Sequence, residues 1–261
     1  MTNPVLASDP KQRFSNRVED YIRYRPGYPS AVLDALRDNC GLRPESVVAD
    51  IGSGTGLLTR MFLENGNAVY GVEPNAAMRE AGEQLSAAYR NFRSVAGSAE
   101  ATTLPGSSVD FVVAGQAFHW FEPAAARAEF RRVLRPGGWV AVLWNERRTD
   151  TTPFLREYES FLRKFGTDYE KVAETYPRGQ QMADFFGVGR FEGRFFPNEQ
   201  VFDFEGLRGR LSSSSYAPPS GHPKHEPMLA ALKTVFDAHE ENGRVHIEYK
   251  THLYYGQLEP Q

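Results

Sequence analysis

VVADIGSGTG, residues 47–56, is the stretch that decides the fold. A short β-branched run reaches three alternating glycines, and the apolar spacing of residues 57–63 then suits a helix. The predicted order is therefore strand, tight turn and helix. Glycine adopts positive φ and lets another molecule lie against the backbone, so Gly52, Gly54 and Gly56 predict a ligand that touches the main chain. The helix would direct its free N-terminal N–H groups at the same place.

An acidic residue before the glycines separates this turn from a dinucleotide site. A dinucleotide fingerprint has its third glycine three residues after the second, where this chain has Leu57, and Gly56 comes one position early. Asp50 would repel a pyrophosphate but could hold an ammonium group. A second apolar strand, residues 67–73, ends in Glu73, where a ribose diol receives hydrogen bonds in an open α/β sheet. The pattern predicts a cationic ligand.

These motifs, with LRPGG at residues 134–138, resemble those of class I S-adenosylmethionine-dependent methyltransferases over about residues 21–145. The resemblance implies a Rossmann-like α/β fold with a seven-stranded, mostly parallel sheet in the order 3-2-1-4-5-7-6, helices on both faces and a helical cap. It implies S-adenosyl-L-methionine as cofactor. Within the family, the chain is similar to small-molecule enzymes of the trans-aconitate methyltransferase type.

The resemblance also implies a cofactor site at the carboxyl ends of the strands. Tyr21 and Arg25 are four residues apart and would share a helix face, so they could cover the methionine end, with Arg25 meeting its carboxylate. The alternative is a surface arginine and a core tyrosine. Glu100 is expected near the adenine, or alternatively caps a helix. The predicted cofactor-binding residues are Tyr21, Arg25, Asp50, Gly52, Ser53, Gly54, Thr55, Gly56, Glu73, Pro74, Ser98, Ala99, Glu100, Gln116 and Ala117.

The loop GQAFHWF, residues 115–121, follows the fourth predicted strand and should face the reactive methyl group. It lacks the Asn/Asp-Pro-Pro-aromatic motif of nucleic-acid amino-methyltransferases and the Pro-Cys nucleophile of cytosine-C5 enzymes. His119 could be a catalytic general base, or only a packed histidine among aromatic residues. The predicted substrate-binding residues are Phe118, His119, Trp120, Arg147, Ser215 and Tyr216. Arg25, Arg147 and His119 as possible anion-binding groups favour an acidic or hydroxylated small metabolite.

Three segments of one structural domain are expected. Residues 1–145 would hold N-terminal helices and the cofactor-binding core, residues 146–190 a helical cap, and residues 191–261 the strands that complete the sheet. Residues 243–255 alternate well enough for an edge strand, although the resemblance places the seventh strand between the fifth and sixth. The histidines lack ligand spacing, so no metal site is expected.

Composition bounds the partners. The chain has 261 residues and a net charge of -3, which gives no reason to expect nucleic acid or an anionic membrane as partner. Its one cysteine, Cys40, cannot form an internal disulfide, and no apolar run approaches the roughly 20 residues of a membrane span. We therefore expect a cytoplasmic protein, a monomer or homodimer, that acts on a small molecule.

Three functions follow from these patterns. The first is an S-adenosylmethionine-dependent methyltransferase whose small-molecule acceptor offers a carboxylate or hydroxyl group. The second is a catalytically silent module that binds the same cofactor. The third is an NAD(P)-dependent oxidoreductase, against which Asp50 and the early Gly56 argue.

Overall fold

The computed structural model describes residues 23–167, 169, 179–214 and 216–258. Two predicted site residues, Tyr21 and Ser215, lie outside the described residues, as does most of the predicted N-terminal helix. Within the described ranges, every helix is too short or too polar to cross a bilayer.

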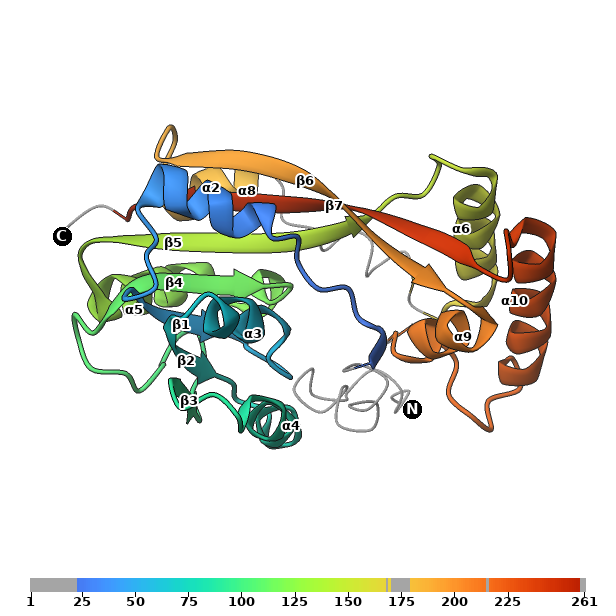
Figure 1. Cartoon of the computed structure of the whole chain (residues 1–261), viewed down its shortest axis with the longest axis horizontal. Helices are drawn as coiled ribbons and strands as arrows, with labels where there is room; N and C mark the ends of the chain where they lie inside the picture. Colours follow the sequence, from blue (N-terminus) through green and yellow to red (C-terminus); the bar gives the residue numbers. More distant parts are fainter. Residues whose placement is uncertain (1–22, 168, 170–178, 215, 259–261) are drawn as a thin grey trace, which may run out of the picture.

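The described residues form one sheet of seven strands in the order β3-β2-β1-β4-β5-β7-β6 (Figure 1). The strands are β1 Val47–Ile51, β2 Ala68–Val72, β3 Phe92–Val95, β4 Val109–Gly115, β5 Leu134–Arg147, β6 Phe191–Phe202 and β7 Val245–Gly256. Neighbours among β1 to β5 pair in parallel, whereas β7 is antiparallel to both β5 and β6. The predicted strand order and mostly parallel sheet are confirmed.

Helices cover both faces of this sheet, as predicted. They are α2 Ala31–Cys40, α3 Leu57–Glu64, α4 Ala76–Ser86, the 3₁₀ helix η4 Phe118–Trp120, α5 Pro123–Val133, α6 Pro153–Phe165, α8 Gly179–Phe186, α9 Phe204–Ser212 and α10 His225–His239. Successive residues of a strand point to opposite faces. In β1, Val48 packs with α2 and α3, while Ala49 packs with α5 and α8.

Local sequence explains where several helices begin. Thr152 precedes α6, and its hydroxyl accepts a hydrogen bond from Leu155 N–H at 3.1 Å, while Pro153 takes the first helical position, where no N–H is needed. Asp203 caps α9 in the same way through Gly206 N–H at 2.8 Å. These caps satisfy N–H groups that the helices themselves leave without partners.

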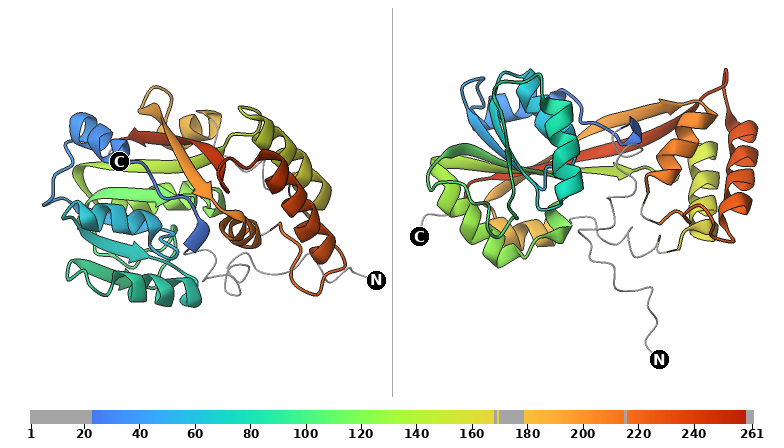
Figure 2. Two further views of the ribbon diagram at one scale, coloured as in Figure 1. Left: turned by 45° about the vertical axis from the view of Figure 1, so that its right-hand side comes forward. Right: turned by 90° about the horizontal axis from the view of Figure 1, so that it is seen from below.

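A separate helical group lies beyond the carboxyl ends of the parallel strands. Helices α6, α9 and α10 share an apolar cluster with the adjoining ends of β6 and β7. Figures 1 and 2 show this group standing apart from the sheet core and joined to it by long strands. Burial of its large side chains, about 1.5–3 kcal/mol each, holds the group together. An open sheet binds ligands at the carboxyl ends of its parallel strands, the end of the core at which this group lies.

Two expectations need correction. The expected cap, residues 146–190, is divided, because α6 joins α9 and α10 whereas α8 buries Met182, Phe185 and Phe186 against the sheet. The expected edge strand is interior, because β7 pairs along both sides and β6 forms the edge. Alternation of apolar residues reports which face is buried and carries no information about neighbours in the plane of the sheet.

Candidate functional site

The glycine turn after β1 has the strained backbone that only glycine adopts easily. Gly52, Gly54 and Gly56 have φ values of +69, +57 and +89°. A Cβ at Gly52 would lie 2.6 Å from the Cβ of Ala117, so the turn and the loop after β4 approach within a distance that no other residue permits. Ala117 therefore supports the turn from behind.

Most N–H groups of the turn have hydrogen-bond partners within the chain. The N–H groups of Gly52 and Ser53 donate to Val72 O at 2.8 and 3.2 Å, and that of Gly54 donates to Glu73 Oε2 at 2.9 Å. Gly56 N–H donates to Ser53 O at 2.9 Å. Close approach to the backbone remains possible, but these amides serve to shape the turn.

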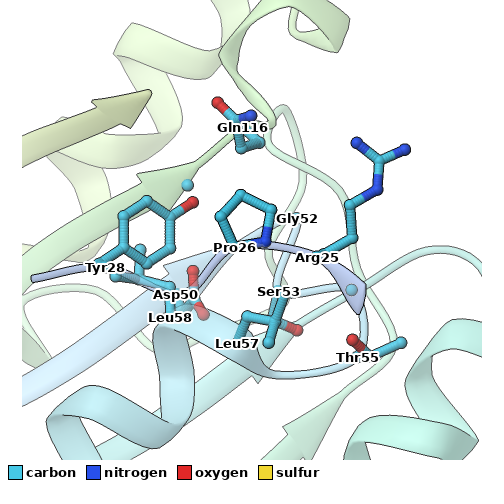
Figure 3. Close-up of a pocket in the computed structure, with 12 residues that line it drawn as sticks. Arg25, Pro26, Tyr28, Asp50, Gly52, Ser53, Thr55, Leu57, Leu58 and Gln116 are labelled. Atoms are coloured by element: carbon cyan, nitrogen blue, oxygen red, sulfur yellow. The ribbon is translucent and has the colours of Figure 1, made fainter. Parts of the chain in front are cut away.

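A pocket of about 460 Å³, including its open side, lies over this turn (Figure 3). Its walls come from the segment before α2, from the turn at the end of β1, and from the end of β4. The lining residues are Arg25, Pro26, Tyr28, Asp50, Gly52, Ser53, Gly54, Thr55, Leu57, Leu58, Gly115 and Gln116. Seven of the predicted cofactor residues are therefore brought together here.

Asp50 is the buried charge of this pocket. Its side chain is 1% exposed, and its Oδ2 accepts a hydrogen bond from Thr59 Oγ1 at 2.6 Å. Its other oxygen, Oδ1, has no hydrogen-bond partner among the described residues. Burial raises the pKa of Asp50 to about 7, against the opposing effect of the Thr59 hydrogen bonds. A cationic ligand in the pocket would supply the missing partner.

Glu73 clamps the turn from the end of β2. Its Oε1 and Oε2 accept hydrogen bonds from Asn75 N–H at 2.8 Å and Gly54 N–H at 2.9 Å. Burial raises the pKa of Glu73, while these two bonds oppose that rise. Each carboxylate oxygen has a second lone pair, so a ligand diol could still donate to Glu73.

Long-range hydrogen bonds hold the segment before α2 over the pocket. At the end of β5, Asn145 Nδ2 donates to Gly27 O at 3.0 Å, and its Oδ1 accepts from Thr251 Oγ1 at 2.6 Å. Arg25 lines the pocket, but its Nη2 donates to Ser213 O at 3.0 Å, and in Figure 3 its guanidinium points away from Asp50. The segment thus links the pocket to the helical group.

Gln116 follows β4 with a φ of +56°, which is uncommon for a residue with a side chain. Its Oε1 accepts from Asn145 N–H at 3.0 Å, which binds the loop to β5. Left-handed residues of this kind cluster at functional sites, where the surrounding structure holds them in place. The local sequence alone does not reveal this conformation.

Comparison with known proteins identifies the fold family. The family described as Methyltransferase domain matches residues 49–142, from β1 to β5. This chain is a class I S-adenosylmethionine-dependent methyltransferase. Its cofactor is S-adenosylmethionine.

Relatives of this methyltransferase extend beyond the matched domain. An uncharacterised methyltransferase-like protein of Schizosaccharomyces pombe is 27% identical over 95% of this chain and 96% of its own length. An uncharacterised methyltransferase of Mycobacterium tuberculosis is 40% identical over 59% of this chain and 60% of its own. A candidate type II methyltransferase of Anaeromyxobacter dehalogenans, 22% identical with a TM-score of 0.68, covers 91% of this chain and 100% of its own and shares the fold.

The pocket of this methyltransferase fits the cofactor chemically. S-adenosylmethionine combines an ammonium group, a sulfonium and a ribose diol. The unpartnered Oδ1 of Asp50 suits a cationic donor, and the remaining lone pairs of Glu73 suit a diol. Gly52 and Gly54 supply the positive φ that the turn requires, and Gly52 also lets the turn approach Ala117.

Several predicted cofactor residues lie beside this pocket without lining it. Gly56 caps the start of α3, and Pro74 is exposed. Ala99 is buried in the sheet core, next to a Ser98 that exchanges backbone hydrogen bonds with Ala101 at 3.1 and 3.3 Å. Glu100 Oε1 accepts from Glu122 N–H at 2.9 Å, at the residue that caps α5. The helix-end alternative for Glu100 is therefore realised, and contact with adenine stays a prediction.

The aromatic loop after β4 is more structural than expected. Phe118 is 5% exposed and packs edge-on against Phe185 in the sheet core, so it does not face the pocket. His119 packs between Trp120 and Trp144, with ring centroids 4.5 and 5.0 Å away. Burial lowers the pKa of His119 to about 4, so its imidazole is neutral at pH 7. Its catalytic role stays a prediction.

The predicted anion-binding Arg147 is already neutralised. It lies at the end of β5, 9% exposed, and its Nη2 contacts Glu159 Oε2 at 2.5 Å and the Tyr169 hydroxyl at 2.6 Å. Tyr216 lies in the same region, half-buried beyond α9. Tyr216 packs against the apolar cluster of the helical group, and Arg147 is paired with Glu159 on α6 of that group.

Sequence reasoning missed five pocket residues, Pro26, Tyr28, Leu57, Leu58 and Gly115. The signal for Tyr28 and Gly115 was weak, because a Cβ at Gly115 would collide with the Tyr28 hydroxyl and only the fold brings the two together. It also missed Arg210. Its signal was available, because Arg210 follows the buried Leu207 by three positions and precedes the buried Leu211 on α9, so it falls on the apolar face. Among the described residues, no group of three or more acidic, histidine or cysteine side chains could hold a metal ion.

Proposed function

We propose that this methyltransferase transfers the methyl group of S-adenosylmethionine to a carboxylate or hydroxyl oxygen of a small molecule. The observation that carries the proposal is the buried Asp50, whose Oδ1 has no partner among the described residues in a pocket built on a glycine turn. A pyrophosphate would meet repulsion there, whereas an ammonium group would meet its counter-charge.

The roles of the surrounding residues follow from their positions. Asp50 would bind the ammonium group and Glu73 the ribose, while the glycine turn would let the nucleoside approach the backbone. Gln116, rigid at positive φ, would border the methionine part. When bound, the cofactor supplies an activated methyl group on a cationic sulfur.

The residues of the chain contribute mainly by positioning the acceptor and excluding water. Holding two reacting groups in line can supply on the order of 7–11 kcal/mol of the barrier. A carboxylate acceptor is ionised at neutral pH and needs no base, whereas a hydroxyl acceptor needs one. His119, with its pKa lowered to about 4, is a weak base, and it stays our candidate only for the hydroxyl case.

Calorimetry with S-adenosylmethionine and S-adenosylhomocysteine tests the cofactor site. We expect the wild type to bind both in the micromolar range. Asp50→Asn keeps the shape and removes the charge, so it should weaken both ligands by about 30-fold or more. The control Asp38→Asn, exposed on α2, should bind like the wild type. If neither ligand binds the wild type, the proposal is wrong.

Labelled S-adenosylmethionine tests the acceptor. The protein is incubated with a panel of small carboxylic acids and alcohols, and the labelled products are identified by mass spectrometry. We expect methyl esters or methyl ethers. Label that enters only amines, proteins or nucleic acids would contradict the acceptor class while leaving the cofactor site intact.

A further inference from the structure

A buried arginine without an acidic partner lies in the helical group. Arg210, on α9, is 7% exposed, and the described residues place no carboxylate within ion-pairing distance of it. Its Nη1 donates to Ser214 Oγ at 3.0 Å, and its Nε lies 3.3 Å from the Tyr249 hydroxyl. A guanidinium is charged at every physiological pH, so this side chain carries a full positive charge among neutral hydroxyl groups.

The neighbouring Arg147 provides an internal comparison. Arg147 is buried to a similar degree, and Glu159 contacts its Nη2 at 2.5 Å. A buried charge is costly unless it is paired. The fold meets that requirement for Arg147, and the described residues leave it unmet for Arg210.

Positive potential is concentrated around Tyr216. Burial alone would raise the pKa of this tyrosine, but the Arg210, Arg147 and Arg25 guanidinium groups outweigh burial and lower it. The three arginines come from α9, β5 and the segment before α2. A net positive effect at Tyr216 is favourable for an anion that binds nearby.

The cluster adjoins the cofactor pocket. Arg25, which lines that pocket, donates from Nη2 to Ser213 O at 3.0 Å, within the turn that also holds Ser214. The ring of Tyr24 packs on Gly209 so closely that a Cβ at Gly209 would overlap it. The backbone carbonyl of Tyr24 accepts a hydrogen bond from Gln200 Nε2 at 3.1 Å. The segment from Tyr24 to Pro26 therefore contacts both α9 and the pocket.

We propose that Arg210 binds a carboxylate of the methyl acceptor and so selects for anionic substrates. The inference rests on the proposed function, whose acceptor it narrows to a molecule that carries at least one carboxylate. The planar guanidinium could contact both oxygens of that group. Ser214 and Tyr249, which already touch Arg210, hold it in the orientation needed, and Tyr216 borders the same site.

Calorimetry with the protein saturated in S-adenosylhomocysteine tests the site. The probes are glutarate, hexanoate and benzoate, each compared with its primary amide, which has the same shape without the charge. We expect at least one carboxylate to bind the wild type at least about 10-fold more tightly than its amide. Arg210→Met should weaken that carboxylate by about 30-fold or more and leave S-adenosylhomocysteine binding unchanged.

Two further variants make the test decisive. Arg208→Met removes an arginine on the same helix that is 50% exposed and paired with Glu205, and it should bind the carboxylate like the wild type. Arg210→Lys keeps a cation but loses the two-pronged contact, so affinity should fall by about 10-fold even if the methionine variant does not fold. Equal affinity in the lysine variant would overturn the proposal.

The remaining outcomes are equally clear. Amides that bind as well as carboxylates, or a wild type that binds S-adenosylhomocysteine but no carboxylate, would overturn the role of Arg210 alone. A wild type that does not bind S-adenosylhomocysteine would overturn the proposed function. Even if S-adenosylhomocysteine does not bind, a carboxylate that binds the wild type and not Arg210→Met would support the anion site.

Discussion

Asp50 lies in a buried environment that disfavours its charged form in the free protein and would favour binding of a cation. Its carboxylate is buried, receives a hydrogen bond from Thr59 on one oxygen, and has a pKa raised to about 7. In the folded protein without ligand, a large fraction of Asp50 is therefore protonated near neutral pH. An ammonium group would favour the ionised form and restore the usual charge of the residue.

The first prediction concerns pH. The pKa of Asp50 in the folded protein lies above the unfolded value near 4, so its contribution to stability is present below about pH 4 and is lost as pH rises to about 7. Relative to Asp50→Asn, the free wild type should therefore lose stability between pH 5 and pH 8. Its affinity for S-adenosylhomocysteine should change in the opposite direction, about 10-fold weaker at pH 6 than at pH 8.

Denaturant unfolding and calorimetry at both pH values measure these two effects. The Asp50→Asn variant is the control, because it has no carboxylate to titrate at that position. A wild type whose affinity is the same at pH 6 and pH 8 would show that Asp50 is ionised before the ligand arrives.

At the scale of elements, the pocket depends on the hydrogen bonds that join β5 and β7 to the segment before α2. Asn145 at the end of β5 joins all three through Gly27 and Thr251. Asn198 on β6 adds a second donor to Gly27 O at 2.9 Å. Strands β5 and β6 thus hold this segment over the glycine turn through hydrogen bonds to Gly27 O.

The second prediction is that Asn145→Ala lowers both stability and cofactor affinity. The substitution leaves the buried Thr251 hydroxyl without its acceptor and removes one of the two side-chain donors to Gly27 O, Asn198 being the other. The loss should cost about 1–3 kcal/mol of unfolding free energy. Thr251→Val is the matched control, because it removes the β7 side of the network without touching Gly27. We expect it to lower the melting temperature and to retain affinity for S-adenosylhomocysteine. Equal affinity losses in both variants would argue that β7 positions the pocket directly.

At the scale of the whole molecule, the chain is divided between a sheet core and a helical group. The sheet core holds the glycine turn and Asp50, and the helical group holds Arg147 and Arg210 (Figures 1 and 2). The long strands β6 and β7 run through both, so the charges of the helical group are held opposite the cofactor pocket. In our proposal, the cofactor binds at the sheet core and the carboxylate of the acceptor binds at the helical group.

The third prediction uses hydrogen exchange. S-adenosylhomocysteine should slow exchange of amides in residues 24–28, 49–58 and 115–117, which surround the pocket. The reason is that a bound ligand stabilises the folded state against local opening. Amides of α10, which packs against α6 far from the turn, should exchange at unchanged rates. Addition of a binding carboxylate should then slow exchange in α9. Uniform protection of the whole chain would contradict the division into two sites.

The sequence alone determined the strand-turn-helix of residues 47–64 and the acidic residues Asp50 and Glu73, whereas the helices on both faces were implied by the family resemblance. These features depend on local sterics and short-range periodicity, and the positive φ values confirm that the three glycines were needed. Family resemblance supplied the strand order. The features that the sequence alone determined involve residues that are close together in the chain.

Only the tertiary structure decided which polar side chains are satisfied and which remain for a ligand. It turned Phe118 into the core, paired Arg147 with Glu159, and buried Arg210 without a carboxylate among the described residues. These outcomes depend on contacts between segments far apart in the sequence, and a linear pattern does not specify such contacts. The pairing of a buried charge is a property of everything that surrounds it, which exists only after the chain has folded.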